Sequence, residues 1–454
     1  MNILLKNNEA DELAFCDLGL GYLAAPLRDA GHDVRLLLTP CDEVGFIRLV
    51  REYRPDVIGI KVLSSGVRNT VRTIEILRRL HPCIIVIGGP HVTGDPEGCL
   101  ELMSADYAFQ GEADRSFPAF IQVLSDGSLV GHREEIAGLI WQEDGRVRVN
   151  PPDMIRDIDP LPLPAWELMP PADHQSLVSR RTPAAPMIAS RGCTDSCTFC
   201  VEGTRRLRIR SVASVMAEIR LLVDNYGVRE IQFLDSNFVF SKKYLMELGQ
   251  AILDAGLEVV FCAPNGTRLE AIDDDVAQML AKIGFYRANI GIESGSGEML
   301  KTLSKRLDLD ILPEKIALLR RHGILVVGNF MLGFPDETVE QMRQSLELAL
   351  KLDLTGANFA IYTPLPGTPL YAGLVSKKLL PGKSRFQGYN YVVYRNDLSV
   401  LSPSALRRFR FWCMFRFLAR PRTVMTLLGL FTDREMRRSL LKRIYGMYIQ
   451  KLLS

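Results

Sequence analysis

Residues 187–200 read Met187-Ile-Ala-Ser-Arg-Gly192-Cys193-Thr-Asp-Ser-Cys197-Thr-Phe-Cys200 and hold three cysteines in a C-x3-C-x2-C spacing. The apolar run at 186–189 predicts a strand, and Gly192 opens the loop that presents the thiols. Thiolates are soft ligands that suit zinc or an iron–sulfur cluster. Because no fourth ligand lies close by in the sequence, the loop predicts a metal centre with one coordination position left open.

The rest of the composition describes a large globular protein. A chain of 454 residues exceeds what one hydrophobic core usually serves, so two or three domains are expected. Six of the nine cysteines are scattered outside the loop, which is not a disulfide framework and favours a reducing cytoplasm. We expect no secretory signal, because residues 1–6 look like a first strand. No transmembrane helix is expected, because no run reaches about 18 uninterrupted apolar residues.

Charge is distributed unevenly along the chain. Residues 401–454 contain ten Arg and two Lys against Asp433 and Glu435, a local charge of +10. The net charge is +2, so the first 400 residues sum to −8. This asymmetry marks the C-terminal region as a separate module, for which residues 406–418, 424–431 and 436–453 predict helices.

Short apolar runs alternate with amphipathic runs over the first 130 residues. Strands are expected at 3–5, 34–38, 56–62, 83–89 and 106–109, and helices at 18–30, 44–53, 66–80, 96–103 and 113–124. This alternation predicts a doubly wound parallel sheet. Ligands of such sheets bind beyond the carboxyl ends of the strands, here in the loops at 61–66, 88–94 and from 111 onward.

A hairpin and a linker follow the first sheet. Residues 137–149 have a hairpin pattern with Asp144-Gly145 as its two-residue turn. Seven prolines between Pro151 and Pro171 then predict a semi-rigid connection between domains.

The strand before the cysteines begins a second series of six β/α units. The further strands are expected at 229–234, 258–262, 287–292, 325–331 and 357–362, with helices at 212–226, 244–255, 274–283 and 337–352. Six units are too few for a closed eight-stranded barrel, so a partial, open barrel is predicted. Polar clusters follow the strands, on the same rim as the cysteine loop.

The predicted fold class is therefore α/β with four regions. Residues 1–135 form a doubly wound, Rossmann-like sheet, and 136–180 form the hairpin and the Pro-rich linker. Residues 181–400 form a partial (β/α)6 barrel of the TIM type, and 401–454 form a basic helical tail.

The loop that holds Cys193, Cys197 and Cys200, with Phe199 before the last cysteine, resembles that of the radical S-adenosylmethionine (SAM) enzymes. The resemblance implies a catalytic [4Fe–4S] cluster held by these three thiolates, with SAM on the fourth iron and cleaved to a 5′-deoxyadenosyl radical. Phe199 would line the adenine side. The alternative is a zinc site with Cys262 or His174 as its fourth ligand.

The resemblance also assigns roles to polar residues at the strand ends. Glu293 matches the position near the ribose or methionine part of SAM, and Arg268 could meet the SAM carboxylate. Asp235 and Asn237 sit at the end of the second strand of the barrel. Each of these residues could instead cap a helix or hold a loop.

The N-terminal region contains Asp17-Leu-Gly-Leu-Gly-Tyr-Leu-Ala-Ala25, Gly88-Gly-Pro-His91 and Gly111-Glu112. With these stretches it resembles the cobalamin (B12)-binding domain of the radical SAM subgroup that includes the magnesium-protoporphyrin ester cyclases. Gly88 and Gly89 would let the backbone approach the ligand, or simply form a tight turn. The D-x-H-x-x-G signature is absent, so cobalamin would lack a histidine ligand. Lys61 stands where a small hydroxyl is expected, and Ser64 or Ser65 could compensate. His91 lies on the same rim, where a loop hydrogen bond is expected.

Three functional hypotheses follow. The first is cobalamin-dependent methylation of an unactivated carbon in a small biosynthetic intermediate, with an external electron donor. The second is the same radical chemistry without methyl transfer, giving dehydration, epimerisation or ring formation, with a first domain that no longer binds cobalamin. The third is a non-catalytic, metal-stabilised scaffold. No nucleic-acid recognition module accompanies the basic tail, which could pack on the barrel or contact a lipid-like substrate or a membrane surface.

Overall fold

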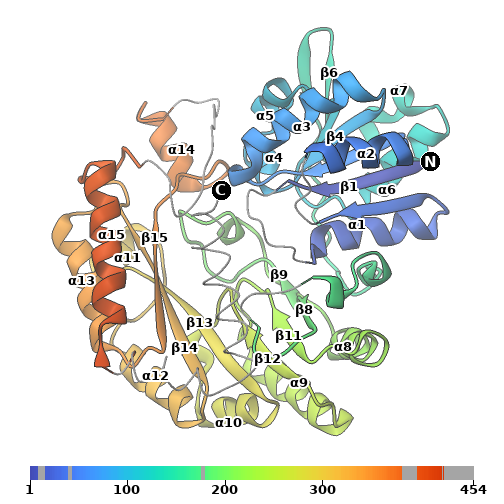
Figure 1. Cartoon of the computed structure of the whole chain (residues 1–454). Helices are drawn as coiled ribbons and strands as arrows, with labels where there is room; N and C mark the ends of the chain where they lie inside the picture. Colours follow the sequence, from blue (N-terminus) through green and yellow to red (C-terminus); the bar gives the residue numbers. More distant parts are fainter. Residues whose placement is uncertain (9–15, 39–42, 175–178, 381–395, 422, 424–454) are drawn as a thin grey trace. The chain divides into compact units, whose positions relative to one another are not determined.

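The computed structural model describes the chain except residues 9–15, 39–42, 175–178, 381–395, 422 and 424–454 (Figure 1). The chain divides into two compact units. The first comprises Met1–His174 together with a later segment that begins at Pro364, and the second comprises the remainder. Two of the three predicted tail helices, at 424–431 and 436–453, lie outside the described residues. Among the described helices, none is long and apolar enough to cross a membrane.

The first unit is built on a seven-stranded sheet with the order β2-β1-β3-β4-β5-β6-β7. Its strands are β1 (Asn2–Asn7), β2 (Asp33–Leu37), β3 (Val57–Lys61), β4 (Ile84–Gly88), β5 (Tyr107–Phe109), β6 (Leu139–Glu143) and β7 (Arg146–Val149). The first five strands pair in parallel, as predicted. The order reverses between β1 and β3, which is the topological switch point where such sheets bind ligands.

Helices α1 (Leu18–Asp29), α2 (Glu43–Tyr53), α3 (Val67–Leu80), α5 (Pro96–Met103) and α6 (Ser116–Ser125) lie at the predicted positions to within about three residues. Two short helices, α4 (Pro90–Gly94) and α7 (Leu129–His132), were not predicted. Each has one turn or little more, which is too short for an amphipathic pattern to show.

The hairpin has the predicted turn, but it belongs to the first sheet and not to the linker region with which it was grouped. Asp144 and Gly145 have φ angles of +49° and +73°, the left-handed pair that a two-residue hairpin turn requires. However, β6 pairs antiparallel with β5, so the hairpin extends the first sheet instead of standing with the linker. Residue 135 is therefore not the end of this unit, because the strand pairing continues across it.

The second unit contains six parallel strands in the order β15-β14-β13-β12-β11-β8. They are β8 (Ala184–Met187), β11 (Glu230–Phe233), β12 (Val260–Ala263), β13 (Phe285–Glu293), β14 (Leu325–Leu332) and β15 (Gly356–Ile361). The intervening helices are α8 (Val212–Tyr226), α9 (Lys242–Ala255), α10 (Asp274–Lys282), α11 (Gly297–Thr302), α12 (Leu312–Arg321) and α13 (Val339–Lys351). β8 and β15 are the end strands of this order, so the described strands form the open partial barrel that was predicted.

The predicted first strand of the barrel, 186–189, is displaced by two residues. β8 pairs with β11 through Ala184–Met187, and the chain then turns at Ala189, whose carbonyl oxygen accepts from the Arg210 backbone. Helix α15 (Pro403–Leu418) lies where the tail helix at 406–418 was predicted and packs against β15 and α13 (Figure 1).

Candidate functional site

The cysteine loop leaves the barrel between two short antiparallel strands, β9 (Ser190–Arg191) and β10 (Arg208–Ile209). Gly192 has a φ of +82°, and a Cβ at this position would lie 2.4 Å from the Arg206 carbonyl oxygen. The Cys193 backbone N–H donates to the Arg205 carbonyl oxygen at 3.2 Å. Glycine is required where the loop opens, because both the backbone angle and this close approach exclude a side chain.

Asp235 supports the junction between β8 and the loop. Its carboxylate accepts from the Ala189 backbone N–H at 3.1 Å and from the Ser190 hydroxyl at 2.5 Å. The residue is 1% exposed, and burial raises the pKa of its carboxyl to about 6 against the lowering effect of these hydrogen bonds. Asp235 does not line the cavity described next, and the contacts that the structure gives it are with the backbone and side chain just before the cysteines.

The three cysteines line one cavity of about 270 Å³. Cys197 is 6% exposed, and burial raises the pKa of its thiol to about 12, opposed by the nearby Lys305. Within the described residues, no three His, Cys, Asp or Glu side chains converge as the ligands of a single metal ion would. An iron–sulfur cluster binds each thiolate to a different iron, so it needs more widely separated sulfurs. Three thiols around one cavity are the donor set that such a cluster requires.

Cys262 does not supply the fourth ligand of the zinc alternative. It is fully buried on β12, where its sulfur lies 3.8 Å from a Glu230 carboxylate oxygen and 3.5 Å from the Arg287 guanidinium. It does not line the cavity of the three cysteines. The other proposed ligand, His174, is not among the residues that line this cavity either.

Four of the polar and aromatic residues predicted for this site do line the cavity, namely Phe199, Asn237, Arg268 and Glu293. The Asn237 amide nitrogen lies 4.0 Å from the Cys193 sulfur. The Arg268 guanidinium donates to the Thr194 hydroxyl at 3.0 Å, and the Phe199 ring packs edge-on against Phe334 at 5.7 Å between centroids. The structure thus brings together side chains from the cysteine loop and from the ends of β11, β12 and β13.

Glu293 occupies a constrained position at the end of β13. It has a φ of +66°, and the pairing of β13 with β14 shifts register just before it. A Cβ on Gly291 would lie 2.5 Å from a Glu293 carboxylate oxygen, so glycine leaves room for this carboxylate. Burial raises the pKa of Glu293 to about 7, and Lys305 opposes the shift. A left-handed, half-buried carboxylate that faces a cavity is typical of a functional residue.

Sequence reasoning missed five charged residues of the cavity, namely Asp195, Glu202, Glu270, Lys305 and Arg306. Asp195 and Lys305 are the least exposed of the five. The Lys305 ammonium lies 3.5 Å from the Asp195 carboxylate, and both residues line the cavity. Asp195 is 6% exposed, and its second carboxylate oxygen has no hydrogen-bond partner in the described structure. Asp195 could have been noted from its place between Cys193 and Cys197. Lys305, in the connection from α11 to α12, carries no local signal.

In the first unit, Lys61 is held by an ion pair at the switch point. Its ammonium lies 2.7 Å from the carboxylate of Asp17, which also accepts from the Leu20 backbone N–H and so caps α1. Lys61 is the last residue of β3, and Gly88 of β4 is its pairing partner. The cation is therefore held at the N-terminus of α1 rather than left to extend from the strand.

Gly88, Gly89 and Ser64 lie on this same edge. Gly89 has a φ of +108°, and a Cβ there would lie 3.0 Å from the Val62 carbonyl oxygen, so a side chain would be strained and crowded. The Ser64 hydroxyl and the His91 ring are hydrogen-bonded at 2.9 Å, which confirms the loop hydrogen bond expected of His91. His91 is 1% exposed, and burial lowers its pKa to about 4. The glycines leave the backbone accessible to a ligand, which fits the corrinoid that the resemblance implies.

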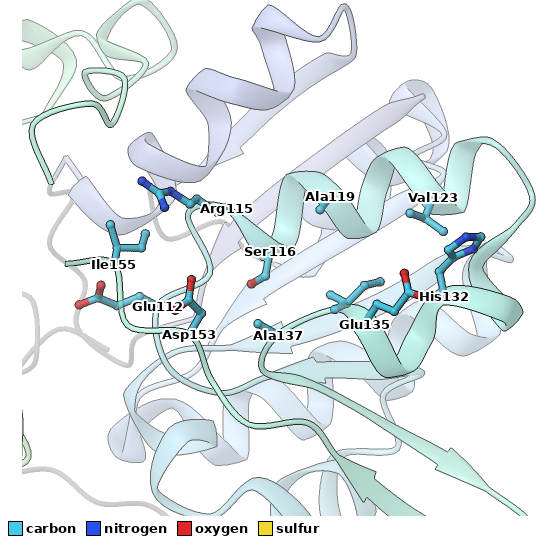
Figure 2. A pocket seen from close by; sticks show the side chains of 11 residues that line it. Glu112, Arg115, Ser116, Ala119, Val123, His132, Glu135, Ala137, Asp153 and Ile155 are labelled. Carbon is cyan, nitrogen blue, oxygen red and sulfur yellow. The ribbon is translucent and has the colours of Figure 1, made fainter. Parts of the chain in front are cut away.

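A second cavity, of about 330 Å³, lies in the first unit between α6 and the segments that enter and leave the hairpin (Figure 2). Its labelled side chains include Glu112, Arg115, Glu135 and Asp153, and the last three of these residues are exposed. It is lined by no thiol and lies away from the switch point between β1 and β3, so it does not belong to the cofactor sites above.

Comparison with known proteins identifies both parts of the chain. Residues 12–121 match the B12 binding domain model and residues 187–349 match the Radical SAM superfamily model. An uncharacterized methyltransferase of Pyrococcus horikoshii is 31% identical over 372 residues, which cover 80% of this chain and 79% of that protein. Cytidylyl-2-hydroxyethylphosphonate methyltransferase of Streptomyces wedmorensis is 28% identical over 78% of this chain and 76% of its own.

Two further similar proteins are a relative named as a cyclase and a solved methyltransferase with lower sequence identity. An anaerobic magnesium-protoporphyrin IX monomethyl ester cyclase of Rubrivivax gelatinosus is 25% identical over 86% of this chain and 70% of its own. The radical SAM methyltransferase TsrM of Kitasatospora setae, solved with cobalamin and a [4Fe–4S] cluster, has the same fold, with a TM-score of 0.69 and 20% identity over 90% of this chain and 81% of its own. The two domain matches confirm the cofactors expected from the sequence, cobalamin for the first domain and SAM with a [4Fe–4S] cluster for the second. The chain belongs to the radical SAM enzymes that carry an N-terminal B12-binding domain.

Proposed function

We propose that the chain is a cobalamin-dependent methyltransferase that methylates an unactivated carbon of a small biosynthetic intermediate, with electrons from an external donor. The observation that supports radical chemistry is the single cavity lined by Cys193, Cys197, Cys200, Glu293 and Lys305. Methyl transfer is supported by the methyltransferase names of similar proteins. When bound, the cluster supplies the electron that cleaves SAM, and cobalamin carries the methyl group.

Under this proposal the residues of the second unit hold and orient SAM. The three thiolates bind the cluster. The Lys305 ammonium is the most enclosed cation of the cavity, with 16% of its side chain exposed, and it pairs with the SAM carboxylate together with Arg268. Glu293 accepts hydrogen bonds from the amino group or the ribose hydroxyls, and Phe199 lies against the adenine. Asp235 positions the loop through Ala189 and Ser190.

In the first unit, the proposal assigns corrinoid binding to the carboxyl ends of β3 and β4. Gly88 and Gly89 allow the close backbone approach, and Ser64 contributes its hydroxyl. Asp17 holds the Lys61 ammonium at the N-terminus of α1, and we infer that this ion pair keeps the cation from blocking the ligand.

The second candidate is radical chemistry without methyl transfer, such as ring formation. It is supported by the similarity to the ester cyclase, whose name describes a cyclisation, and by Lys61 at a position where a small hydroxyl was expected. In this case the first domain has lost the corrinoid or uses it differently.

The experiment is anaerobic purification, reconstitution with iron and sulfide, and incubation with SAM, a reductant and hydroxocobalamin. We expect bound iron and sulfide in equal amounts, cleavage of SAM to 5′-deoxyadenosine, and co-elution of cobalamin. Cys197→Ala should lose the cluster, whereas Cys262→Ala should keep it, because Cys262 is buried in a separate network on β12. A wild-type chain that binds no cluster would refute both candidates. SAM cleavage without cobalamin binding would refute the first and favour the second.

A further inference from the structure

The outer face of α15 is unlike any other described surface of the chain. Phe411, Trp412 and Phe415 are 72%, 40% and 59% exposed, and Leu418 is 45% exposed. All the described Phe and Trp residues that are classed as exposed lie on this one helix. Their spacing of three to four residues places them on one stripe, which continues toward the helix N-terminus as Arg407 and Arg408.

The inner face of the same helix is firmly attached to the barrel. Leu406, Cys413 and Phe417 are buried. The Arg410 guanidinium donates to the Phe359 carbonyl oxygen on β15 at 2.6 Å. Just after the helix, Arg420 donates to the carbonyl oxygens of Ala349, Leu352 and Leu354 at 2.9 to 3.2 Å. Because these contacts fix which side faces inward, the exposed stripe is a fixed surface and not a frayed end.

This surface is positively charged as well as aromatic. Helix α15 contains four arginines and no acidic residue. Arg407, Arg408 and Arg416 are exposed, and the Arg416 guanidinium lies 5.4 Å from the centroid of the Trp412 ring. An exposed helix face that combines arginines with Phe, Trp and Leu is the pattern of helices that lie in the headgroup region of a membrane.

We propose that the outer face of α15, formed by Arg407, Arg408, Phe411, Trp412, Phe415, Arg416 and Leu418, docks on an anionic phospholipid surface. The aromatic and leucine side chains enter the boundary between headgroups and acyl chains, and the arginines pair with the phosphates of anionic lipids. The contact is peripheral, because the inner face of α15 is buried against the barrel and only the outer face is offered to the lipid.

Charge favours a phospholipid surface over the C-terminal residues of the chain or a second copy as the partner of this stripe. Residues 424–454 follow closely in the sequence and carry six basic against two acidic side chains, so covering the stripe with them would bring like charges together. If a second copy of the chain packed its stripe against this one, the arginines of the two copies would face each other and repel. Single-stranded nucleic acid is also anionic, but proteins bind it with aromatic side chains inside a basic groove. The stripe lies on the outer side of a helix and forms no such groove.

The test is flotation of the full chain with vesicles of phosphatidylcholine alone and of phosphatidylcholine mixed with phosphatidylglycerol. We expect binding to the mixed vesicles, weaker binding at high salt, and little binding to the neutral vesicles. Phe411→Ser with Phe415→Ser should weaken binding about tenfold or more, because two large apolar groups no longer enter the membrane. Arg407→Gln with Arg408→Gln should weaken it about thirtyfold and reduce its salt dependence, at about 1 kcal/mol per arginine.

The control is Leu253→Ser on α9, which removes an exposed apolar side chain (38% exposed) away from the stripe and should bind like the wild type. Thermal unfolding of each variant checks that the barrel is intact, and the arginine pair gives a second readout if the phenylalanine pair does not fold. The proposal is overturned if the wild type does not float, if it binds neutral vesicles equally well, or if both double variants bind normally. Two other results would also overturn it. One is that the double variants abolish a concentration-dependent dimerisation but leave flotation unchanged. The other is that they abolish binding to an oligonucleotide but leave flotation unchanged.

Discussion

The carboxylate of Asp195, between the first two cysteines of the loop, lies 3.5 Å from the ammonium nitrogen of Lys305, 110 positions later in the chain. The pair places one positive and one negative charge in the cavity of the three thiols. Lys305 also lies close to Glu293, since a Cβ on Gly291 would be within 4 Å of both side chains. The electrostatic environment of the thiols is therefore set by residues from two separate loops.

Opposite effects are expected from removing the two charges. Lys305→Met should make the cluster harder to reduce, with a midpoint potential on the order of 50 mV more negative, because a nearby cation stabilises the added electron. Asp195→Asn should shift the potential in the positive direction. Potentiometric titration followed by electron paramagnetic resonance measures both.

Lys301→Met is the matched control for Lys305→Met, since Lys301 is exposed on α11 and does not line the cavity. It should leave the potential unchanged. Shifts of the same sign in Lys305→Met and Asp195→Asn would contradict an electrostatic effect and point to distortion of the loop.

Gly203 should be essential to the shape of the cysteine loop. A Cβ at this position would lie 2.9 Å from the backbone nitrogen of Cys197 and 3.0 Å from its carbonyl oxygen. Gly203→Ala should therefore displace Cys197, lower the free energy of unfolding by about 1–3 kcal/mol and reduce iron binding. Gly297→Ala is the control, because its Cβ would meet no atom within 4 Å. Iron content and thermal unfolding of the two variants should separate them, and equal iron binding would contradict the steric argument.

The ion pair between Asp17 and Lys61 should determine corrinoid affinity. Asp17→Asn keeps a side chain that can cap α1 but removes the charge that holds Lys61. Loss of this ion pair should weaken hydroxocobalamin binding about tenfold, measured by equilibrium dialysis. Lys61→Ser should bind at least as tightly as the wild type, and the double variant should behave like Lys61→Ser. Weaker binding by Lys61→Ser alone would show instead that the lysine contacts the ligand.

Buried Glu337 should make the apoprotein less stable as pH rises. Its carboxylate accepts from the Gly333 and Phe334 backbone N–H groups, and burial raises its pKa from 4.5 to about 7. The folded state therefore binds the proton more tightly than the unfolded state, so stability falls between about pH 4.5 and pH 7 and is flat above. The loss amounts to about 3 kcal/mol for this group.

Glu337→Gln removes this dependence while keeping an acceptor for the two backbone groups. Urea unfolding at pH 5 and pH 8 should show a smaller stability difference in the variant than in the wild type. Some difference should remain, because burial raises the pKa values of Asp235 and Glu293 in the same direction. An unchanged difference would mean that Glu337 does not titrate in this range.

The fold was predictable where local signals agreed with one another. Helix α8 has its predicted bounds, because Ser211 caps its first turn and Gly227 ends it in the left-handed conformation. The turn at Asp144-Gly145 was likewise predictable from two residues that tolerate positive φ. The position of the hairpin in the fold was not predictable. It depends on β6 finding the unpaired edge of the first sheet at β5, and no local sequence signal shows which edge is unpaired.

The site was predictable only in part. The three cysteines lie close together in the sequence, so their spacing alone indicated a metal centre. The direction of Asp235 could not be read from the sequence, because a polar residue at a strand end can point toward the cavity or, as here, toward the backbone of the neighbouring strand end. Lys305 could not be found, because only the folded chain brings the α11–α12 connection to the cysteine loop.

The segment that begins at Pro364 belongs to the first unit, although the barrel separates it from that unit in the sequence. Tyr371 on helix α14 (Pro369–Ser376) packs in the first unit's core, and the Pro366 backbone leaves no room for a Cβ on Gly94. During synthesis the ribosome must therefore complete Gln175–Thr363, which takes roughly ten seconds or longer, before the first unit has all its parts. The B12-binding domain, although first in the sequence, is thus completed only after the barrel strands have been made.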